Sequence, residues 1–525
     1  MPSSHCTGRL YPGSELPPGD LVHYQSRGAL LLICDEPFDP TPLRETDLPG
    51  TTVLVSPESP ARGPAGLPGE VRHVGGRISR LDGWLGAFRP ELVEITGDAP
   101  DSLSPKRDGT FDLVIDMGKT RLIRRSVLPY GYFTARNAGQ LTVALAACKE
   151  LVGAHAKPKY FNYDRNLCAH ASFGQAGCTR CLEVCGAAAI RSEGDRIVVT
   201  PELCQGCAAC TVACPTGALS FREPGRETLL ERLEAAMANA RESRPVLVVH
   251  PPGLEPAPPE SAEWVKLMVE PVAAFGEELW FAALARGAAG VLLSVDPESP
   301  AETAGLLAGR VSIANALARA CGLGENVIGI QAVGAVPGAG MATENIRQST
   351  PLVAAFDGAA AQTKRALLND SLKALEPSGG HDPVPLDPGA PLGAIAVDPQ
   401  RCTLCSACAK ICPTAAIRYV DELEAGRSVL SFLEAECVQC GACANGCPEH
   451  AIRLEPRFAP ASVRSEWRII SEDSMAACAD CGQPFLASKL MAASLRRLTA
   501  TQAPMAAVEQ LKRCPDCRHR RIVEG

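Results

Sequence analysis

Short apolar runs dominate the beginning of the chain and predict a small α/β domain over residues 1–158. Residues 29–34, 52–55 and 111–116 are almost continuously apolar, and loops rich in proline and glycine separate them. Apolar runs of about 4–8 residues between turn signals are typical of buried strands. Residues 137–151 have helical composition, so we expect a helix that leads into the following segment.

A second region, residues 225–370, alternates between strand-like apolar runs and helical segments. Such alternation favours a parallel sheet with helices on its faces, and thus a second small α/β domain. The expected strands are 246–249, 265–269, 291–295 and 327–330, and the expected helices are 226–243, 277–286 and 303–321. Residues 371–392 are dense in proline, glycine and aspartate, which predicts a flexible or extended linker.

Cysteines concentrate in the other segments, at residues 159–224, at 393–457 and in the tail at 458–525. The first two segments are an internal duplication, and each contains two copies of one smaller motif. Twenty-four cysteines would indicate disulfides in a small secreted protein. Residues 1–24 contain neither a secretory signal nor a membrane anchor, so we expect a cytoplasmic protein whose cysteines bind metal.

The charge pattern argues against nucleic acid as a partner. The formal net charge is −8 over 525 residues, and no long run carries a single sign. No stretch is apolar enough for a membrane span. We therefore expect neither a nucleic-acid partner nor a membrane span.

Three cysteine runs have the full bacterial ferredoxin pattern CxxCxxCxxxCP. The close spacing lets one loop hold three corners of a cubane, while the fourth thiolate reaches the neighbouring cluster of a two-cluster ferredoxin. The motifs are therefore expected to work in pairs. They begin at Cys204, Cys402 and Cys437.

The motif at Cys168, Cys178, Cys181 and Cys185 is altered. Nine residues separate its first two cysteines, and Gly186 stands where the other motifs have proline. Both the loss and the retention of its cluster stay open. Retention is compatible with the longer loop, because each doubling of loop length costs only about 0.6 kcal/mol in closure entropy.

Crossed pairing predicts about four [4Fe-4S] clusters, which perform one-electron transfer. Zinc is the alternative, but zinc sites rarely repeat this motif in tandem. The predicted ligand sets are Cys168, Cys178, Cys181 and Cys214; Cys204, Cys207, Cys210 and Cys185; Cys402, Cys405, Cys408 and Cys447; and Cys437, Cys440, Cys443 and Cys412.

The tail carries two further CxxC pairs, Cys478 with Cys481 and Cys514 with Cys517. Two such knuckles suit a tetrahedral zinc ribbon with four thiolate ligands. A rubredoxin-type iron site is the alternative, although basic residues follow Cys517 where a rubredoxin knuckle has glycine. The predicted fold class is thus an α+β and α/β multidomain protein with two bacterial-type two-cluster ferredoxin modules, two small α/β domains and a C-terminal zinc ribbon.

Residues 177–185, with Cys168-Ala169-His170 before them and Cys204-Gln205-Gly206-Cys207 after them, resemble large 4Fe-4S binding proteins associated with molybdenum or tungsten formate dehydrogenases. Residues 286–293, followed by Arg310, are similar to the small iron-sulfur (delta) subunit of methyl-viologen-reducing hydrogenase, whose cluster cysteines are missing here. This resemblance implies that residues 225–370 keep a docking surface without a redox centre.

The resemblance implies a non-catalytic electron-transfer subunit. It would relay electrons to or from a formate dehydrogenase or a related hydrogenase or heterodisulfide-reductase assembly. Two other functions stay open. One is an assembly or maturation factor for a metalloenzyme, and the other is a self-contained oxidoreductase with an unrecognised flavin.

Overall fold

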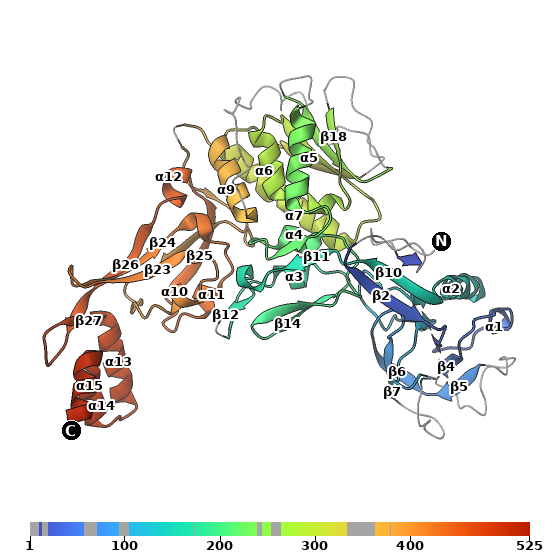
Figure 1. The fold of residues 1–525 in the computed structure, drawn as a ribbon, viewed down its shortest axis with the longest axis horizontal. Coiled ribbons are helices and arrows are strands. Elements are labelled where there is room, and N and C mark those ends of the chain that lie inside the picture. The colour runs from blue at the N-terminus through green and yellow to red at the C-terminus, as the bar shows by residue number, and fades with distance from the viewer. Residues whose placement is uncertain are drawn as a thin grey trace.

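The computed structural model describes residues 10–12, 19–56, 71–93, 104, 106–172, 174–238, 244–253, 264–332, 363–378 and 380–524. Figure 1 shows an elongated chain, with an N-terminal α/β domain at one end and a helical C-terminal tail at the other. Two cysteine-rich modules lie between these ends, and a central α/β domain lies over them.

The N-terminal domain is built on a five-stranded parallel sheet in the order β5-β4-β3-β8-β9. The three predicted strands are confirmed as β3, β4 and β8, and the predicted helix is α2. Alternate residues of β3 enter two different cores, so the strand is buried on both faces. The elements are β3 (Leu30–Ile33), β4 (Thr52–Ser56), β5 (Arg72–Gly75), β8 (Leu113–Asp116), β9 (Tyr132–Thr134), α1 (Thr41–Arg44) and α2 (Ala138–Glu150).

Two smaller antiparallel sheets complete this domain, and the pattern of apolar runs predicts neither. Their strands are short or mixed in polarity, as in β7, where exposed and half-buried residues alternate. One sheet has the order β1-β10-β2, and the other is the hairpin β6-β7. The strands are β1 (Tyr11–Pro12), β2 (Leu21–Ser26), β6 (Arg77–Asp82), β7 (Arg89–Val93) and β10 (Gly153–Pro158).

The two cysteine-rich modules share one architecture. In each, the first and last strands pair with each other, and two short helices that carry cysteines lie in contact. The first module contains β11 (Phe161–Tyr163), α3 (Arg180–Glu183), β14 (Ile190–Glu193), β15 (Arg196–Val199), α4 (Ala209–Ala213) and β16 (Leu219–Phe221). The second contains β22 (Gly393–Val397), α10 (Ala407–Ile411), β23 (Ile417–Glu422), β24 (Arg427–Phe432), α11 (Ala442–Asn445) and β25 (Ile452–Phe458).

The long loop of the altered motif folds into a hairpin of its own, which the other three motifs lack. Its strands β12 (Ala171–Ser172) and β13 (Gln175–Ala176) pair between Cys168 and Cys178. Short 3-10 helices directly precede the first cysteine of two motifs: η2 (Arg165–Leu167) precedes Cys168, and η5 (Glu434–Glu436) precedes Cys437.

The central domain has a four-stranded parallel sheet in the order β18-β17-β19-β20, which confirms the predicted strand and helix alternation. All nine residues of α6 are buried, as expected of a helix covered on every side. The elements are α5 (Arg226–Ala238), β17 (Val246–His250), β18 (Trp264–Met268), η3 (Val272–Ala274), α6 (Glu277–Ala285), β19 (Gly290–Val295), α7 (Ala301–Ala320), β20 (Ile328–Ala332) and α9 (Lys364–Leu375).

The predicted boundary at residue 370 falls within a helix, and the predicted linker after it contains a strand. Helix α9 spans the boundary at residue 370, and it packs on α6. Within the predicted linker, β21 (Val384–Pro385) pairs with β25, so this part of the segment is extended and attached to the second module.

The tail continues the second module rather than standing apart from it. Strand β24 pairs with β26 (Arg468–Ala477), which in turn pairs with β27 (Pro484–Ala487). The tail helices are α12 (Ala461–Arg464), α13 (Ser488–Ala500), α14 (Met505–Leu511) and α15 (Pro515–Glu524).

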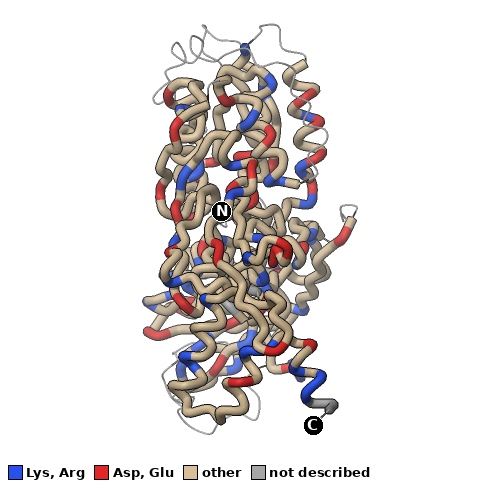
Figure 2. The backbone as a smooth tube through the Cα atoms, turned by 90° about the vertical axis from the view of Figure 1, so that its left-hand side faces the viewer, with Lys and Arg blue, Asp and Glu red and all other residues tan. Residues whose placement is uncertain are grey.

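Acidic and basic residues are interspersed along the backbone in Figure 2, in keeping with the small net charge. Within the described part of the chain, none of the helices has the length and apolar composition that crossing a bilayer requires.

Candidate metal centres

The first module contains a cavity of about 310 Å³ that is lined by Cys168, Cys178, Cys181 and Cys214. We call these four residues the first group. Cys214 belongs to the following motif, so the group crosses between motifs as the two-cluster ferredoxin pattern predicts. Burial, and next the thiolate of Cys214, raise the pKa of Cys181 to about 12.

The second group consists of Cys185, Cys204, Cys207 and Cys210, again with one member from the other motif. Burial raises the pKa of Cys204 to about 11, and the thiolates of Cys207 and Cys185 act in the same direction. The same two thiolates, together with Cys204, add to the effect of burial on the pKa of Cys210.

The second module repeats this arrangement around two cavities of about 360 and 340 Å³. The equal cysteine counts, with one member of each group from the other motif, indicate equivalent sites. The third group is Cys402, Cys405, Cys408 and Cys447, and the fourth group is Cys412, Cys437, Cys440 and Cys443.

All four motifs share a backbone bend three residues after their last cysteine. The residues at this position have a left-handed backbone, which costs about 1–2 kcal/mol outside glycine and persists only where the surroundings require it. The bend allows backbone N–H groups to return to the thiols, as Ala189 N donates to Cys185 Sγ at 3.2 Å. The altered motif therefore keeps the common geometry. The four residues are Ala188 (φ 47°), Gly217 (φ 77°), Ala415 (φ 53°) and His450 (φ 48°).

The missing proline of the altered motif also has a structural reason. The N-terminal domain packs directly on Gly186, whose carbonyl accepts a hydrogen bond from Val127 N at 3.2 Å. A Cβ atom at residue 186 would lie 2.5 Å from Ser126 Oγ and 3.2 Å from Val127 Cγ2. Glycine at this position thus allows the close contact between the domain and the motif.

The donor chemistry of the four groups fits iron–sulfur clusters. Buried thiols close to one another resist ionisation, because each thiolate repels the next in a medium of low polarity. A bound cationic iron core relieves this repulsion, and cysteine thiolates are its usual protein ligands. His170, which lines the first cavity, contacts Ser192 Oγ at 2.8 Å and Cys178 O at 2.9 Å through its two ring nitrogens.

Buried cations hold the ligand loops, and no sequence motif indicates them. The fully buried Lys157 donates from Nζ to the carbonyls of Glu202 (3.1 Å) and Cys204. Arg365 donates to the carbonyls of Ala435 (2.8 Å), Cys437 (2.9 Å) and Pro391 (3.0 Å). The sequence alone does not distinguish these two cations from surface cations, because their acceptors are backbone carbonyls, which every residue has.

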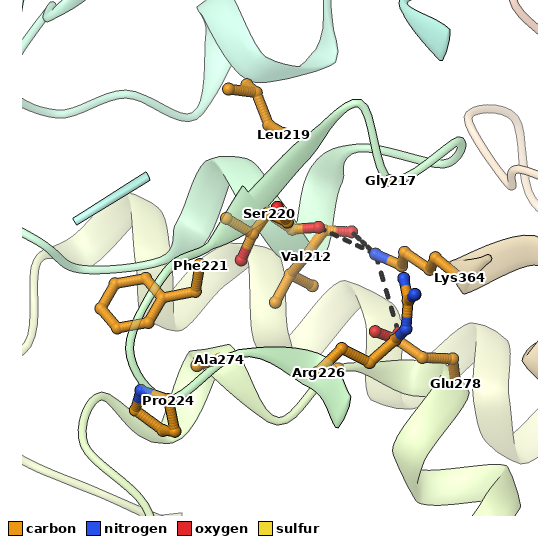
Figure 3. A pocket seen from close by; sticks show the side chains of 12 residues that line it. Val212, Gly217, Leu219, Ser220, Phe221, Pro224, Arg226, Ala274, Glu278 and Lys364 are labelled. Carbon is orange, nitrogen blue, oxygen red and sulfur yellow. Dashed lines mark hydrogen bonds and ion pairs between the residues drawn. The ribbon is translucent and has the colours of Figure 1, made fainter. Parts of the chain in front are cut away.

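The central domain contacts the first module through a second pair of buried cations. Lys364 Nζ donates to Thr211 O at 2.8 Å and Val212 O at 3.1 Å, and lies 3.8 Å from Glu278 (Figure 3). Arg310 donates to Ala213 O at 3.3 Å. These are the last carbonyls of α4, where a helix end favours positive charge. A cavity of about 380 Å³ lies beside this contact.

The tail brings its four cysteines together as a separate group. Their sulfurs lie within 4.8 Å of one another, and the sulfurs of Cys481 and Cys514 are 3.8 Å apart. A tetrahedral site with metal–sulfur bonds of about 2.3 Å has sulfurs about 3.8 Å apart, so the group can hold one metal ion. Backbone N–H groups of Cys481 and Cys514 lower the pKa of Cys478 to about 6, which favours the ligating thiolate.

The tail differs from a ribbon made only of strands. Cys478 and Cys481 follow β26, whereas Cys514 and Cys517 lie at the beginning of α15.

Two segments match known domain families. Residues 401–451 match the 4Fe-4S dicluster domain, and residues 197–220 match the 4Fe-4S binding domain. No curated protein matches the chain. The chain thus contains two ferredoxin-type domains that bind iron–sulfur clusters, which supports an electron-transfer role. The altered motif at residues 168–185 lies outside both matches.

Proposed function

We propose that the chain is a cytoplasmic, non-catalytic electron-transfer subunit with four [4Fe-4S] clusters. It relays electrons to or from a formate dehydrogenase or a related hydrogenase or heterodisulfide-reductase complex, and the partner supplies the catalytic chemistry. The observation that carries the proposal is the crossed grouping of sixteen cysteines around four sites, three of which are cavities lined by their four cysteines. Crossed groups are the arrangement of two-cluster ferredoxins, whose chemistry is electron transfer.

In this proposal the four cysteine groups hold the clusters, and the central domain docks a partner protein. The tail group holds zinc in a structural role. Four thiolates can fill all four positions of a tetrahedral metal ion and leave none for a substrate, which favours such a role.

The test is formate-driven reduction of the anaerobically prepared chain. The visible absorbance of its clusters should bleach when formate and a catalytic formate dehydrogenase subunit are added together, and should not bleach with either alone. Clusters that dithionite reduces but no redox partner reduces or reoxidises would contradict the proposal. That result would favour the maturation-factor alternative.

A further inference from the structure

The hairpin of the altered motif joins the two ferredoxin modules. In Figure 1, β12 lies beside α11 of the second module, and β13 contacts that helix. Asn445 Nδ2 in α11 donates to Ala176 O in β13 at 2.9 Å. A Cβ atom on Gly177 would lie 3.5 Å from Ala442 Cβ. The residues inserted between Cys168 and Cys178 therefore form part of the contact between modules.

Arg180 crosses the same junction from a position between two ligands of the first group. Its guanidinium donates to Val438 O at 3.3 Å and to Ala390 O at 3.2 Å. Val438 itself lies between Cys437 and Cys440 of the fourth group. One arginine thus connects the ligand loop of the first group with that of the fourth.

Inside each module, one short helix connects the two groups. Cys210 of the second group lies in α4, and Cys214 of the first group directly follows that helix, with Cys214 N donating to Cys210 O at 3.0 Å. Helix α10 contains Cys408 of the third group and is followed by Cys412 of the fourth. One helical turn separates the groups in both cases.

We propose that the four groups form one continuous relay in the order second, first, fourth, third, and that Arg180 is the positioning residue at the junction between the modules. The inference rests on the proposed function, because it requires clusters in all four groups. A single electron moves at each step from a reduced cluster to an oxidised neighbour. No bond forms or breaks, and no proton is transferred.

A positive charge beside two clusters stabilises the reduced, more negative form of both. Arg180→Gln should therefore shift two of the four reduction potentials to more negative values and leave the other two unchanged. Arg180→Lys, which keeps the charge, should largely restore them. Arg191→Gln makes the same charge change on an exposed arginine of the first module and should shift none.

The measurement is a potentiometric titration followed by electron paramagnetic resonance, with iron content determined in parallel. The two shifted signals should be those that Cys214→Ser and Cys412→Ser remove. A shift in only one signal, in a different pair or in none would overturn the relay order. A wild-type chain without four clusters would instead refute the proposed function.

If Arg180→Gln loses iron, electron paramagnetic resonance of the fully reduced wild-type protein tests the relay order instead. The signals of the first and fourth groups should enhance each other's spin relaxation. Independent relaxation of these two signals would overturn the inference.

Discussion

Lys157 is a buried cation that contacts a ligand loop of the second group. Its Nζ lies 5.2 Å from the centre of the Tyr130 ring and donates to the carbonyl of Cys204, a member of the second group. Its charge lowers the pKa of Cys204 against the larger effect of burial. A buried cation in this position offsets part of the negative charge that thiolate ligands bring into the protein.

We therefore predict that Lys157→Met shifts the potential of the second cluster to a more negative value. The change also leaves the carbonyls of Glu202 and Cys204 without their donor, which should destabilise the loop by about 1–3 kcal/mol. Potentiometric titration and the thermal midpoint of cluster loss measure the two effects. Lys159→Met is the control, since Lys159 contacts the Phe161 ring and should leave that potential unchanged.

Ligand crossing gives a second prediction at this scale. Cys214→Ser should impair the first cluster and spare the one at Cys204, Cys207 and Cys210, while Cys185→Ser should do the reverse. Neither change should remove a signal of the second module. Electron paramagnetic resonance and iron analysis of the reduced variants identify the missing cluster. If Cys214→Ser removed only the cluster of its own motif, each motif would hold an independent site.

The cysteine groups were predictable because their spacing is local, whereas the cations around them were not. Three ligands of each cluster lie close together in the chain, and the fourth follows from the repeat. Arg365 contacts carbonyls about 70 residues further along the chain. No pattern within a single sequence predicts a contact over such a separation.

At the scale of elements, the beginning of α9 connects all three neighbouring parts of the chain. Lys364 donates to the first module and Arg365 to the second, while α9 itself packs on α6 of the central domain. The two side chains are almost fully buried. Helix α9 thus fixes the distance between the modules.

Arg365→Met should weaken the attachment of the second module to α9 by about 1–3 kcal/mol, because three buried carbonyls lose their donor. Hydrogen exchange should rise in α9 and around Cys437, and iron content should stay constant. Lys373→Met changes an exposed lysine of the same helix and should leave exchange unchanged. Equal exchange in the two variants would show that Arg365 does not hold this junction.

The tail group makes a prediction for its own elements. Cys514→Ser should remove about one zinc per chain and unfold α15, which begins beside that cysteine, without loss of iron. Metal analysis and limited proteolysis of residues 478–524 measure these effects. His519→Gln alters an exposed neighbour and should keep the zinc. Loss of iron without loss of zinc would favour the rubredoxin-type alternative.

Periodic elements of the central domain were predicted well, because apolar runs of a parallel sheet are long and uniform. The beginning of α9 was missed, since it carries two charged residues that sequence analysis assigns to the surface. Strand β21 was missed because two residues paired to a distant strand leave no periodic signal.

At the scale of the whole molecule, the contacts between parts converge on the cysteine groups. The N-terminal domain packs on Gly186 beside the second group, and the central domain holds the end of α4 between the first two groups. The hairpin of the altered motif contacts the second module. The residues inserted in this motif thus help to hold the two modules together.

Native mass spectrometry of the anaerobically prepared protein measures whether one chain carries four clusters and one tail metal. We expect a mass increase equivalent to about sixteen irons with their sulfides and one zinc per chain. A mass equivalent to about twelve irons would show that the altered motif holds no cluster, and the relay would then lack its second member. A chain that carries only zinc would show that the four cysteine groups hold no clusters and that the protein is not an electron-transfer subunit.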